Sequence, residues 1–225
     1  CIIENQDLNA HKIFKETLCK SIDILEKDLG NIHHFINKSD INNSRLKAIQ
    51  NVNSLELKSE LYFKQAEKFL IKLLGPDISI QNKLNLSIQL PFDDSSLLPL
   101  HTDTIAGQSV FEVVLWIPFT KCFDQNSMYI IPIEKRKEMM SKIGQYGSLG
   151  MKKLEDDYKE FKKFIQIIPN QILIFSPTIE ESIRIKSVKV DIFNLGSRPR
   201  SFKKFLFELG LCREKSNPET NSISL

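Results

Sequence analysis

Apolar residues recur with a helical period in the first third of the chain. Between residues 9 and 29 they step by four, four, three and four positions, at Phe14, Leu18, Ile22, Leu25 and Leu29. This spacing places the five side chains on one face and predicts an amphipathic helix over 9–29, with Gly30 as its C-terminal cap. Residues 44–75 are predicted to be helical in at least one piece, which ends at Gly75-Pro76-Asp77.

After Pro76 the apolar period changes to two, as in a strand with one buried face. Leu84, Leu86, Ile88 and Leu90 alternate with polar residues. Further strands are predicted over 111–119, 127–133, 164–168, 171–175, 184–188 and 190–195. The opening Cys1-Ile2-Ile3-Glu4 is typical of the second half of a strand, and because it lacks Met we expect the start of the chain to be truncated. The charged insertion 134–163 is predicted to be partly helical and to lie over the mouth of a barrel.

Helices followed by short strands indicate an α+β fold. We expect a double-stranded β-helix, or jelly roll, with the N-terminal helices packed on one of its faces. The 225 residues are predicted to form a single domain, with a mainly helical part over 1–76, a jelly-roll core over 84–195 and a frayed polar tail over 216–225.

The composition narrows the classes of partner that the chain is expected to bind. The net charge is +3, from 31 basic and 28 acidic residues, so nothing indicates binding to nucleic acid or to an acidic membrane surface. No apolar run approaches the roughly 20 residues that span a bilayer, and no signal peptide is visible. The four cysteines form no C-x-x-C pair, which favours reduced thiols in a cytoplasmic protein.

The candidate chemistry begins at His101-Thr102-Asp103. On an extended segment residues i and i+2 share a face, so His101 and Asp103 would present an imidazole and a carboxylate side by side. That pair is two thirds of the facial triad that holds non-heme Fe(II), although the two side chains could instead hydrogen-bond to each other and cap a loop. The four histidines are His11, His33, His34 and His101, so none follows to complete the triad. His33 and His34 are adjacent, cannot share one face, and are predicted to lie at the surface.

The wider context carries a resemblance to a known family. The order Leu86-Ser87-Ile88-Gln89-Leu90-Pro91, then Leu97-Leu98-Pro99-Leu100-His101-Thr102-Asp103, then 111–119, then Asn126-Ser127-Met128-Tyr129 resembles Fe(II)/2-oxoglutarate oxygenases. The similarity is to the phytanoyl-CoA-hydroxylase-like superfamily, and to its branch found in sporadic carbohydrate-biosynthesis and aminoglycoside gene clusters. It extends from about Leu84 to Pro177.

The resemblance implies an oxidative reaction that uses Fe(II), 2-oxoglutarate and oxygen. His101 and Asp103 match the first two metal ligands of the family. Aligned on Phe175 and Arg184, the distal His falls on Glu181. Aligned on Asn194, the Arg that grips the far carboxylate of 2-oxoglutarate falls on Gly196.

Two substitutes for the missing groups are available. Glu181 could serve as the third metal ligand, giving a set that suits Mn or Mg as well as Fe(II). Arg198 lies two residues beyond Gly196 and could bind 2-oxoglutarate through its guanidinium. The opposing interpretation is that Glu181 and Arg198 are ordinary charged residues at the surface.

Three further residues are candidate cofactor contacts. Asn126 and Tyr129 match the family phrase N-S-M-Y. Gln89 faces opposite Ile88 and Leu90, so it points either to solvent or into the barrel, where it would need a polar partner.

Three functions remain open on the sequence. The first is an oxygenase with an atypical or impaired metal site, acting on a carbohydrate or other polar small metabolite. The second is a non-catalytic jelly-roll binding protein derived from that family. The third is a chain whose last third is degenerate and forms no stable site. Nothing in the sequence identifies the substrate or the oligomeric state.

Overall fold

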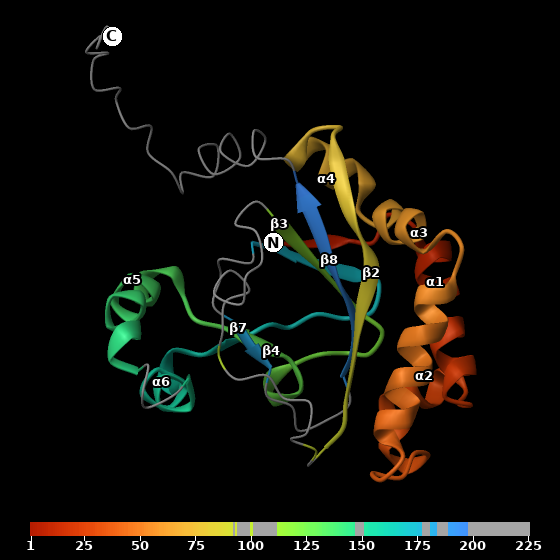
Figure 1. The fold of residues 1–225 in the computed structure, drawn as a ribbon, viewed down its shortest axis with the longest axis horizontal. Helices are drawn as coiled ribbons and strands as arrows, with labels where there is room; N and C mark the ends of the chain where they lie inside the picture. The colour runs from red at the N-terminus through yellow and green to blue at the C-terminus, as the bar shows by residue number, and fades with distance from the viewer. Residues whose placement is uncertain are drawn as a thin grey trace, which may run out of the picture.

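A computed structural model describes residues 1–91, 93, 100, 112–146, 151–176, 181–183 and 189–197 of the chain. The described residues form a mixed α+β fold whose helices gather at the N-terminal end of the sequence, as expected (Figure 1). The predicted strand 184–188, the predicted tail 216–225 and the candidate residues His101, Asp103 and Arg198 lie outside the described residues.

The helical part comes first along the chain. It contains α1 (Leu8–Ser21), a 3-10 segment (Glu26–His34), α2 (Ile41–Ser54), α3 (Lys58–Lys64) and α4 (Glu67–Leu74). The later insertion contains α5 (Ile133–Lys142) and α6 (Met151–Asp157), with 3-10 turns over Ile143–Tyr146 and Lys159–Phe161. Within the described residues, no helix is both long and apolar enough to cross a membrane.

The described strands form two antiparallel sheets. The large sheet has the order β1 (Ile2–Glu4), β6 (Gln171–Phe175), β3 (Glu112–Pro118), β8 (Lys189–Ser197) and β2 (Ile78–Gln89). The small sheet has the order β5 (Lys163–Phe164), β4 (Met128–Ile130) and β7 (Glu181–Ile183). The predicted strand at the start of the chain is therefore confirmed, since β1 pairs with β6 from Ile2–Leu173 to Glu4–Gln171.

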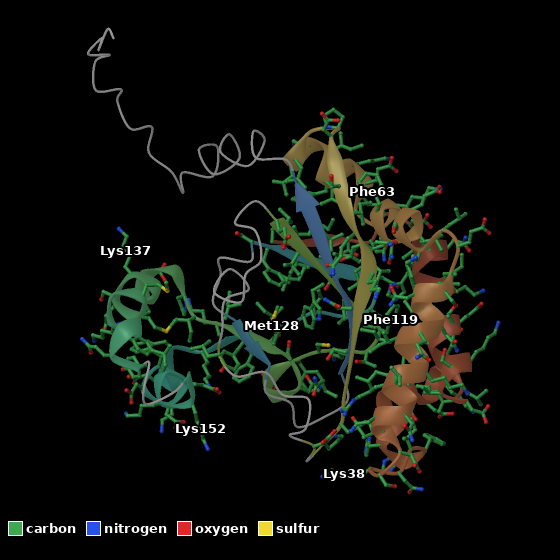
Figure 2. All side chains as sticks on the ribbon, in the orientation of Figure 1. Lys38, Phe63, Phe119, Met128, Lys137 and Lys152 are labelled. Atoms are coloured by element: carbon green, nitrogen blue, oxygen red, sulfur yellow. The ribbon has the colours of Figure 1, made fainter. Side chains whose placement is uncertain are left out.

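The large sheet is buried on both faces, and β3 shows why its sequence is almost continuously apolar. Val113, Leu115 and Ile117 pack with the helices α1 to α4 in the main core cluster. Val114 and Trp116 point the other way, into a second cluster that includes Met128 of β4. The molecule thus has three layers, in the order helices, large sheet, small sheet (Figures 1 and 2).

Hydrogen bonds join the helical layer to the large sheet at specific points. The Tyr62 hydroxyl of α3 donates to the Leu115 carbonyl of β3 over 2.8 Å. The Asn53 amide of α2 accepts from the Leu84 N–H at 2.8 Å and donates to the Leu84 carbonyl at 2.9 Å. These bonds satisfy polar groups that would otherwise be buried without partners.

The prediction of one helix over 9–29 with a cap at Gly30 is wrong. α1 ends at Ser21, and Asp23 has a φ of 55°, in the left-handed region that a continuing helix cannot use. Leu29 is buried, as the spacing predicted, but it belongs to the 3-10 segment and not to α1. Gly30 is an interior position of the same segment. Leu25 is 61% exposed. The apolar spacing therefore predicted most of the buried positions without detecting the break between the two pieces.

The other sequence predictions agree better with the structure. The helical region 44–75 forms three pieces, α2, α3 and α4, and Gly75 ends the last with a φ of 83°. Leu84, Leu86, Ile88 and Leu90 are all buried against the helices, and β2 extends further back to Ile78. Asn170, with a φ of 76°, turns the chain into β6, between the predicted strands 164–168 and 171–175.

Candidate functional site

Leu100 is the described residue nearest to the candidate metal ligands, since it directly precedes His101. Its side chain is completely buried. It belongs to one hydrophobic cluster with Tyr129 of β4 and with Ile131, which directly follows β4. The same cluster contains three side chains of the insertion, Met139, Leu154 and Tyr158. The chain is therefore held against β4 immediately before the His-x-Asp motif.

Glu181 lies on a strand that pairs with β4. β7 pairs with β4 in antiparallel register, with Met128 opposite Ile183, Tyr129 opposite Ser182 and Ile130 opposite Glu181. The two segments that carry the predicted ligands, far apart in sequence, thus share β4 as a neighbour.

The two faces of β4 have different surroundings. Met128 faces the large sheet and packs with Trp116, Val114, Leu173 and Phe175. Tyr129 faces the other way, towards the insertion, where its ring meets Phe164 edge-on at 5.7 Å and lies 4.3 Å from the Lys162 ammonium. Figure 2 shows Met128 near the centre of the molecule, and Lys137 and Lys152 projecting outward from the insertion. The cofactor role of Tyr129 stays a prediction, and its ring lies on the face of β4 away from Met128.

Gln89 lies on the face of β2 that points away from the helices. Its neighbours Ile88 and Leu90 pack in the helix-side core, whereas Gln89 is 3% exposed on the opposite face. Its amide nitrogen donates to the Ser87 hydroxyl at 3.0 Å, and Lys189 of β8 lies opposite it in register. Of the two orientations left open by the sequence, solvent or interior, the structure gives the interior.

Asn126 is held by a turn. Its side-chain oxygen accepts from the Phe123 N–H, and its nitrogen lies 3.5 Å from the Lys121 carbonyl. These contacts stabilise the 3-10 turn Asp124–Asn126 that leads into β4. Its predicted contact with a cofactor remains untested.

Gly196 occupies a position between two strands. It lies opposite Ser79 of β2 and opposite Glu112 of β3. The position at which the resembling family carries its 2-oxoglutarate arginine therefore supplies no cation here and has a half-buried carboxylate residue as its cross-strand neighbour. Gly196 itself offers a dianionic co-substrate no charge-assisted hydrogen bond.

The remaining histidines do not form a second metal site in the described part of the chain. No group of three or more His, Cys, Asp or Glu that could hold a metal occurs there. His33 and His34 are exposed, as predicted, and their ring centroids lie 4.0 Å apart. His11 is buried beside Phe119, at 4.9 Å between ring centroids.

One contact near the candidate site was not predicted from the sequence. Arg45 of α2 forms an ion pair of 2.7 Å with Asp93, which lies just after β2 on the path to His101. Arg45 resembles any other polar residue of an amphipathic helix, and Asp93 is one of several polar residues that are consecutive in the sequence. Only the packing of α2 against the end of β2 brings them together.

The insertion packs beside the small sheet. Met139 of α5 and Leu154 of α6 join Tyr129 and Leu100 in the cluster described above. The Lys162–Glu155 ion pair, at 2.8 Å with side chains 9% and 14% exposed, joins α6 to the residue before β5. The insertion is partly helical, as predicted; whether it also covers a barrel mouth stays a prediction.

No protein-family model matches the sequence, and no curated protein is significantly similar to it. Among solved structures, the non-heme monooxygenase ThoJ in complex with nickel is 11% identical over 88% of this chain and 74% of its own, with a TM-score of 0.47. HygX from Streptomyces hygroscopicus, with nickel and 2-oxoglutarate bound, is 9% identical over 73% of this chain and 80% of its own, with a TM-score of 0.48. SnoK, an alpha-ketoglutarate-dependent carbocyclase from nogalamycin biosynthesis, is 14% identical over 66% of this chain and 61% of its own, with a TM-score of 0.39. All three likenesses are at low sequence identity, and their TM-scores describe only a partial overlap of fold.

Proposed function

We propose that this protein is a jelly-roll oxygenase of the Fe(II)/2-oxoglutarate type with an atypical metal site formed by His101, Asp103 and Glu181. Its substrate is proposed to be a carbohydrate or another polar small metabolite in the cytoplasm. The observation that carries the proposal is the shared strand β4, which has the residue before His101 packed in its cluster and Glu181 in its ladder.

This convergence is informative because the sequence motif alone is weak. A lone His-x-Asp is common by chance, and Glu181 was aligned only through Phe175 and Arg184. The ladder register of β7 on β4 is independent of that alignment. It brings the backbone of Glu181 to the strand against which Leu100 is held.

The path of the chain between the two sheets supports the jelly-roll part of the proposal. After β3 in the large sheet come β4 and β5 in the small sheet, then β6 in the large, β7 in the small and β8 in the large sheet. Repeated crossing between two antiparallel sheets is the connectivity of a double-sheet jelly roll.

The proposed ligands are one imidazole and two carboxylates, a set that suits Fe(II), Mn and Mg. When bound, iron would supply the oxygen chemistry that amino-acid side chains lack. The chain's own groups would hold and orient the reactants: the Gln89 amide lies on the interior face of β2, and Arg198 is proposed to bind the far carboxylate of 2-oxoglutarate. Val114, Trp116 and Met128 form an apolar region between the sheets that excludes water.

A second candidate is a non-catalytic jelly-roll protein that binds a polar ligand. The position of Gly196, opposite Glu112, favours it because glycine supplies no cation for a dianionic co-substrate at this position. The two candidates differ in turnover and in their need for 2-oxoglutarate.

Metal binding by the purified chain tests the proposal. We expect one Fe(II) or Mn(II) per chain by calorimetry under anaerobic conditions, and loss of this binding in His101→Ala and in Asp103→Ala. His34→Ala, which removes an exposed imidazole, is the matched control and should bind as the unmodified chain does. Equal binding by His101→Ala would refute the site. Metal binding without any effect of 2-oxoglutarate on affinity would favour the second candidate.

A further inference from the structure

We propose that helix α2 closes the free edge of the large sheet, with Asn53 in the place of a neighbouring strand. The edge so covered is a pairing surface for the same edge of a second copy of this chain, which α2 keeps out. This inference does not depend on the proposed metal site, because it concerns only the helical layer and β2.

β2 is the last strand of the large sheet in the part of the chain that the structure describes, and β8 is its ladder partner there. In an antiparallel ladder, alternate residues direct both backbone groups towards the partner strand, and the residues between them direct both groups away. The outward N–H and C=O groups of an edge strand are a template on which another strand can pair. An edge as long as β2, which extends over Ile78–Gln89, therefore needs protection.

Asn53 supplies this protection at Leu84. Its Oδ1 accepts from the Leu84 N–H at 2.8 Å, and its Nδ2 donates to the Leu84 carbonyl at 2.9 Å. These are the two bonds that a residue of an added strand would make with Leu84. Nδ2 also donates to the Ile49 carbonyl of its own helix at 2.9 Å, so both of its hydrogens are used and the amide is held in this orientation.

The protection continues along the same edge. The ladder with β8 is regular over 85–89, so Leu86 and Ile88 direct their backbone groups outward, as Leu84 does. The Ile88 carbonyl accepts from Arg45 Nε of α2 at 2.8 Å. Figure 1 shows α2 alongside β2. Side chains of one helix thus bond both ends of this stretch, and a strand can pair there only after α2 has moved.

The first half of β2 is protected by other means. Gln81, Asn82 and Lys83 are exposed, and the register with β8 shifts between Ile80 and Asn85. A lysine and an irregular register both hinder the addition of a strand. α2 therefore covers the half of the edge in which the ladder is regular.

A second copy suits the covered edge, because this stretch is self-complementary in antiparallel pairing. With the two Leu86 residues opposite each other, Leu84 lies opposite Ile88. On the other face of the strand, Asn85 lies opposite Ser87. Apolar residues then meet apolar residues and polar residues meet polar ones, as in stable cross-strand pairs. Both α2 helices would lie on the same side of the joined sheet, so pairing requires that α2 leave the edge.

The experiment compares Asn53→Ala and Asn53→Asp with the unmodified full chain. The readouts are Tm, mass in solution by sedimentation at several protein concentrations, and hydrogen–deuterium exchange at the Leu84 amide. In dilute solution Asn53→Ala should speed this exchange by about fivefold, the effect of one lost hydrogen bond. As concentration rises it should associate more strongly than the unmodified chain. Asn53→Asp keeps the size of the side chain but loses both donors, and should change in the same direction.

Tyr62→Phe is the matched control for stability. The Tyr62 hydroxyl also joins the helical layer to the large sheet, but its acceptor, the Leu115 carbonyl, belongs to β3, which has a strand on each side. Tyr62→Phe should therefore lower Tm without increasing association.

Asn85→Lys, added to Asn53→Ala, separates strand pairing from other kinds of association. Asn85 is exposed, and in the paired strands the two introduced lysines would be diagonal neighbours, which destabilises the pair through like charges. We expect the double variant to associate no more than the unmodified chain does, at the Tm of Asn53→Ala.

Three results would overturn the proposal: no gain of association in either Asn53 variant, an equal gain in Tyr62→Phe, or a gain that survives Asn85→Lys. The unmodified chain gives a test that needs no variant. Its Leu84 amide should exchange as slowly as the Ser87 amide, which the ladder with β8 protects. Much faster exchange at Leu84 would show that α2 does not close the edge.

Discussion

In the alignment on which the resemblance rests, Glu181 replaces the distal imidazole of the oxygenases and Gly196 replaces their arginine. Each replacement would make the proposed site more negative or less positive. Glu112, opposite Gly196 in the ladder, adds a further carboxylate residue at the same place. Because 2-oxoglutarate is a dianion, the charge of these residues bears directly on whether it binds.

We expect the unmodified chain to convert 2-oxoglutarate to succinate weakly or not at all. Hydrogen bonds to charged groups contribute about 1.5–3 kcal/mol each, so the missing arginine alone weakens co-substrate binding by roughly one to two orders of magnitude. Glu181→His combined with Gly196→Arg should raise succinate release accordingly, by about tenfold to a hundredfold. The measurement is succinate formed per metal-loaded chain.

Glu112 provides a refinement of this test. Residues opposite each other in an antiparallel ladder lie close enough for the guanidinium introduced by Gly196→Arg to pair with Glu112 in place of the co-substrate. Adding Glu112→Gln to the double variant should therefore increase succinate release further. Robust succinate release by the unmodified chain would show that Glu181 and Arg198 already supply the missing functions.

His11 bears on the stability of the folded protein, and not on the proposed site. Burial lowers the pKa of the His11 imidazole below its ordinary value of 6.5; Lys15 adds to this lowering, and Gln65 and Glu26 oppose it. Neither ring nitrogen has a hydrogen-bond partner of ordinary geometry within the described part of the chain. The folded protein therefore favours the neutral ring, and protonation favours unfolding.

The sign of the pH dependence follows from this lowered pKa. Well above pH 6.5 the ring is neutral in both states and does not alter stability with pH. As pH falls below 6.5 the unfolded chain takes up the proton first, so stability is lost down through the folded-state pKa. Tm should fall over this range, and His11→Leu should flatten the fall. His34→Gln, at an exposed position, should leave the slope unchanged. An unaltered slope in His11→Leu would assign the acid sensitivity to other groups.

At the scale of elements, the sequence predicted which segments are helices or strands better than it predicted where each one begins and ends. The alternation at Leu84–Leu90 and the apolar run 111–119 correspond to β2 and β3, because each pattern reflects burial of a whole face. The break at Asp23 was missed, since a helix and a following 3-10 turn can bury residues with the same spacing. Local patterns also carry no information on which distant strands pair, so the registers of Glu181 on β4 and of Gly196 beside Glu112 could not be predicted.

Gly75 ends the helical part with a conformation that other residues avoid. Its φ of 83° and ψ of 179° fall in a region used almost only by glycine, and a Cβ there would meet no atom within 4 Å. Gly75→Ala should therefore destabilise the protein through backbone strain alone, by about 1–3 kcal/mol. For a chain of this size that is a fall in Tm of roughly 2–12 °C.

Gly30→Ala is the matched control for this prediction. A Cβ at Gly30 also meets nothing within 4 Å, and its φ is not in the left-handed region. The substitution should leave Tm unchanged or raise it slightly, because alanine reduces the freedom of the unfolded chain. Equal losses at the two positions would show that something other than the conformation of Gly75 is responsible.

At the scale of the whole molecule, the large sheet depends on cover from both sides. On one face, Leu84, Ile88, Val113, Leu115 and Ile117 of the large sheet pack against the helices. On the other face, Trp116 of the large sheet packs in a cluster with Met128 of the small sheet. The change of apolar period near Pro76 predicted that helices and strands belong to separate parts of the sequence and that the helices pack on one face of the strands. The main core cluster, which contains side chains of both parts, agrees with this prediction.

A fragment of residues 77–225 should therefore fail to fold independently, despite containing every described strand except β1. Removing the helices exposes a continuous apolar sheet face, and such patches drive aggregation. We expect the fragment to bind a hydrophobic dye strongly and to sediment as aggregates. Deletion of 216–225, the predicted polar tail, is the control and should behave as the full chain does. A monomeric 77–225 fragment with a cooperative thermal transition would contradict the shared core.

The hydrophobic cluster that contains Leu100 has a consequence for how such a protein changes over time. Met139 and Leu154 of the insertion share that cluster with the residue next to His101, so the insertion and the proposed metal-binding segment are not independent modules. If the proposed site binds a metal, sequence changes in the insertion would affect it without any change in a ligand. Exchanging this insertion for another to alter substrate choice would then alter the proposed metal site in the same step.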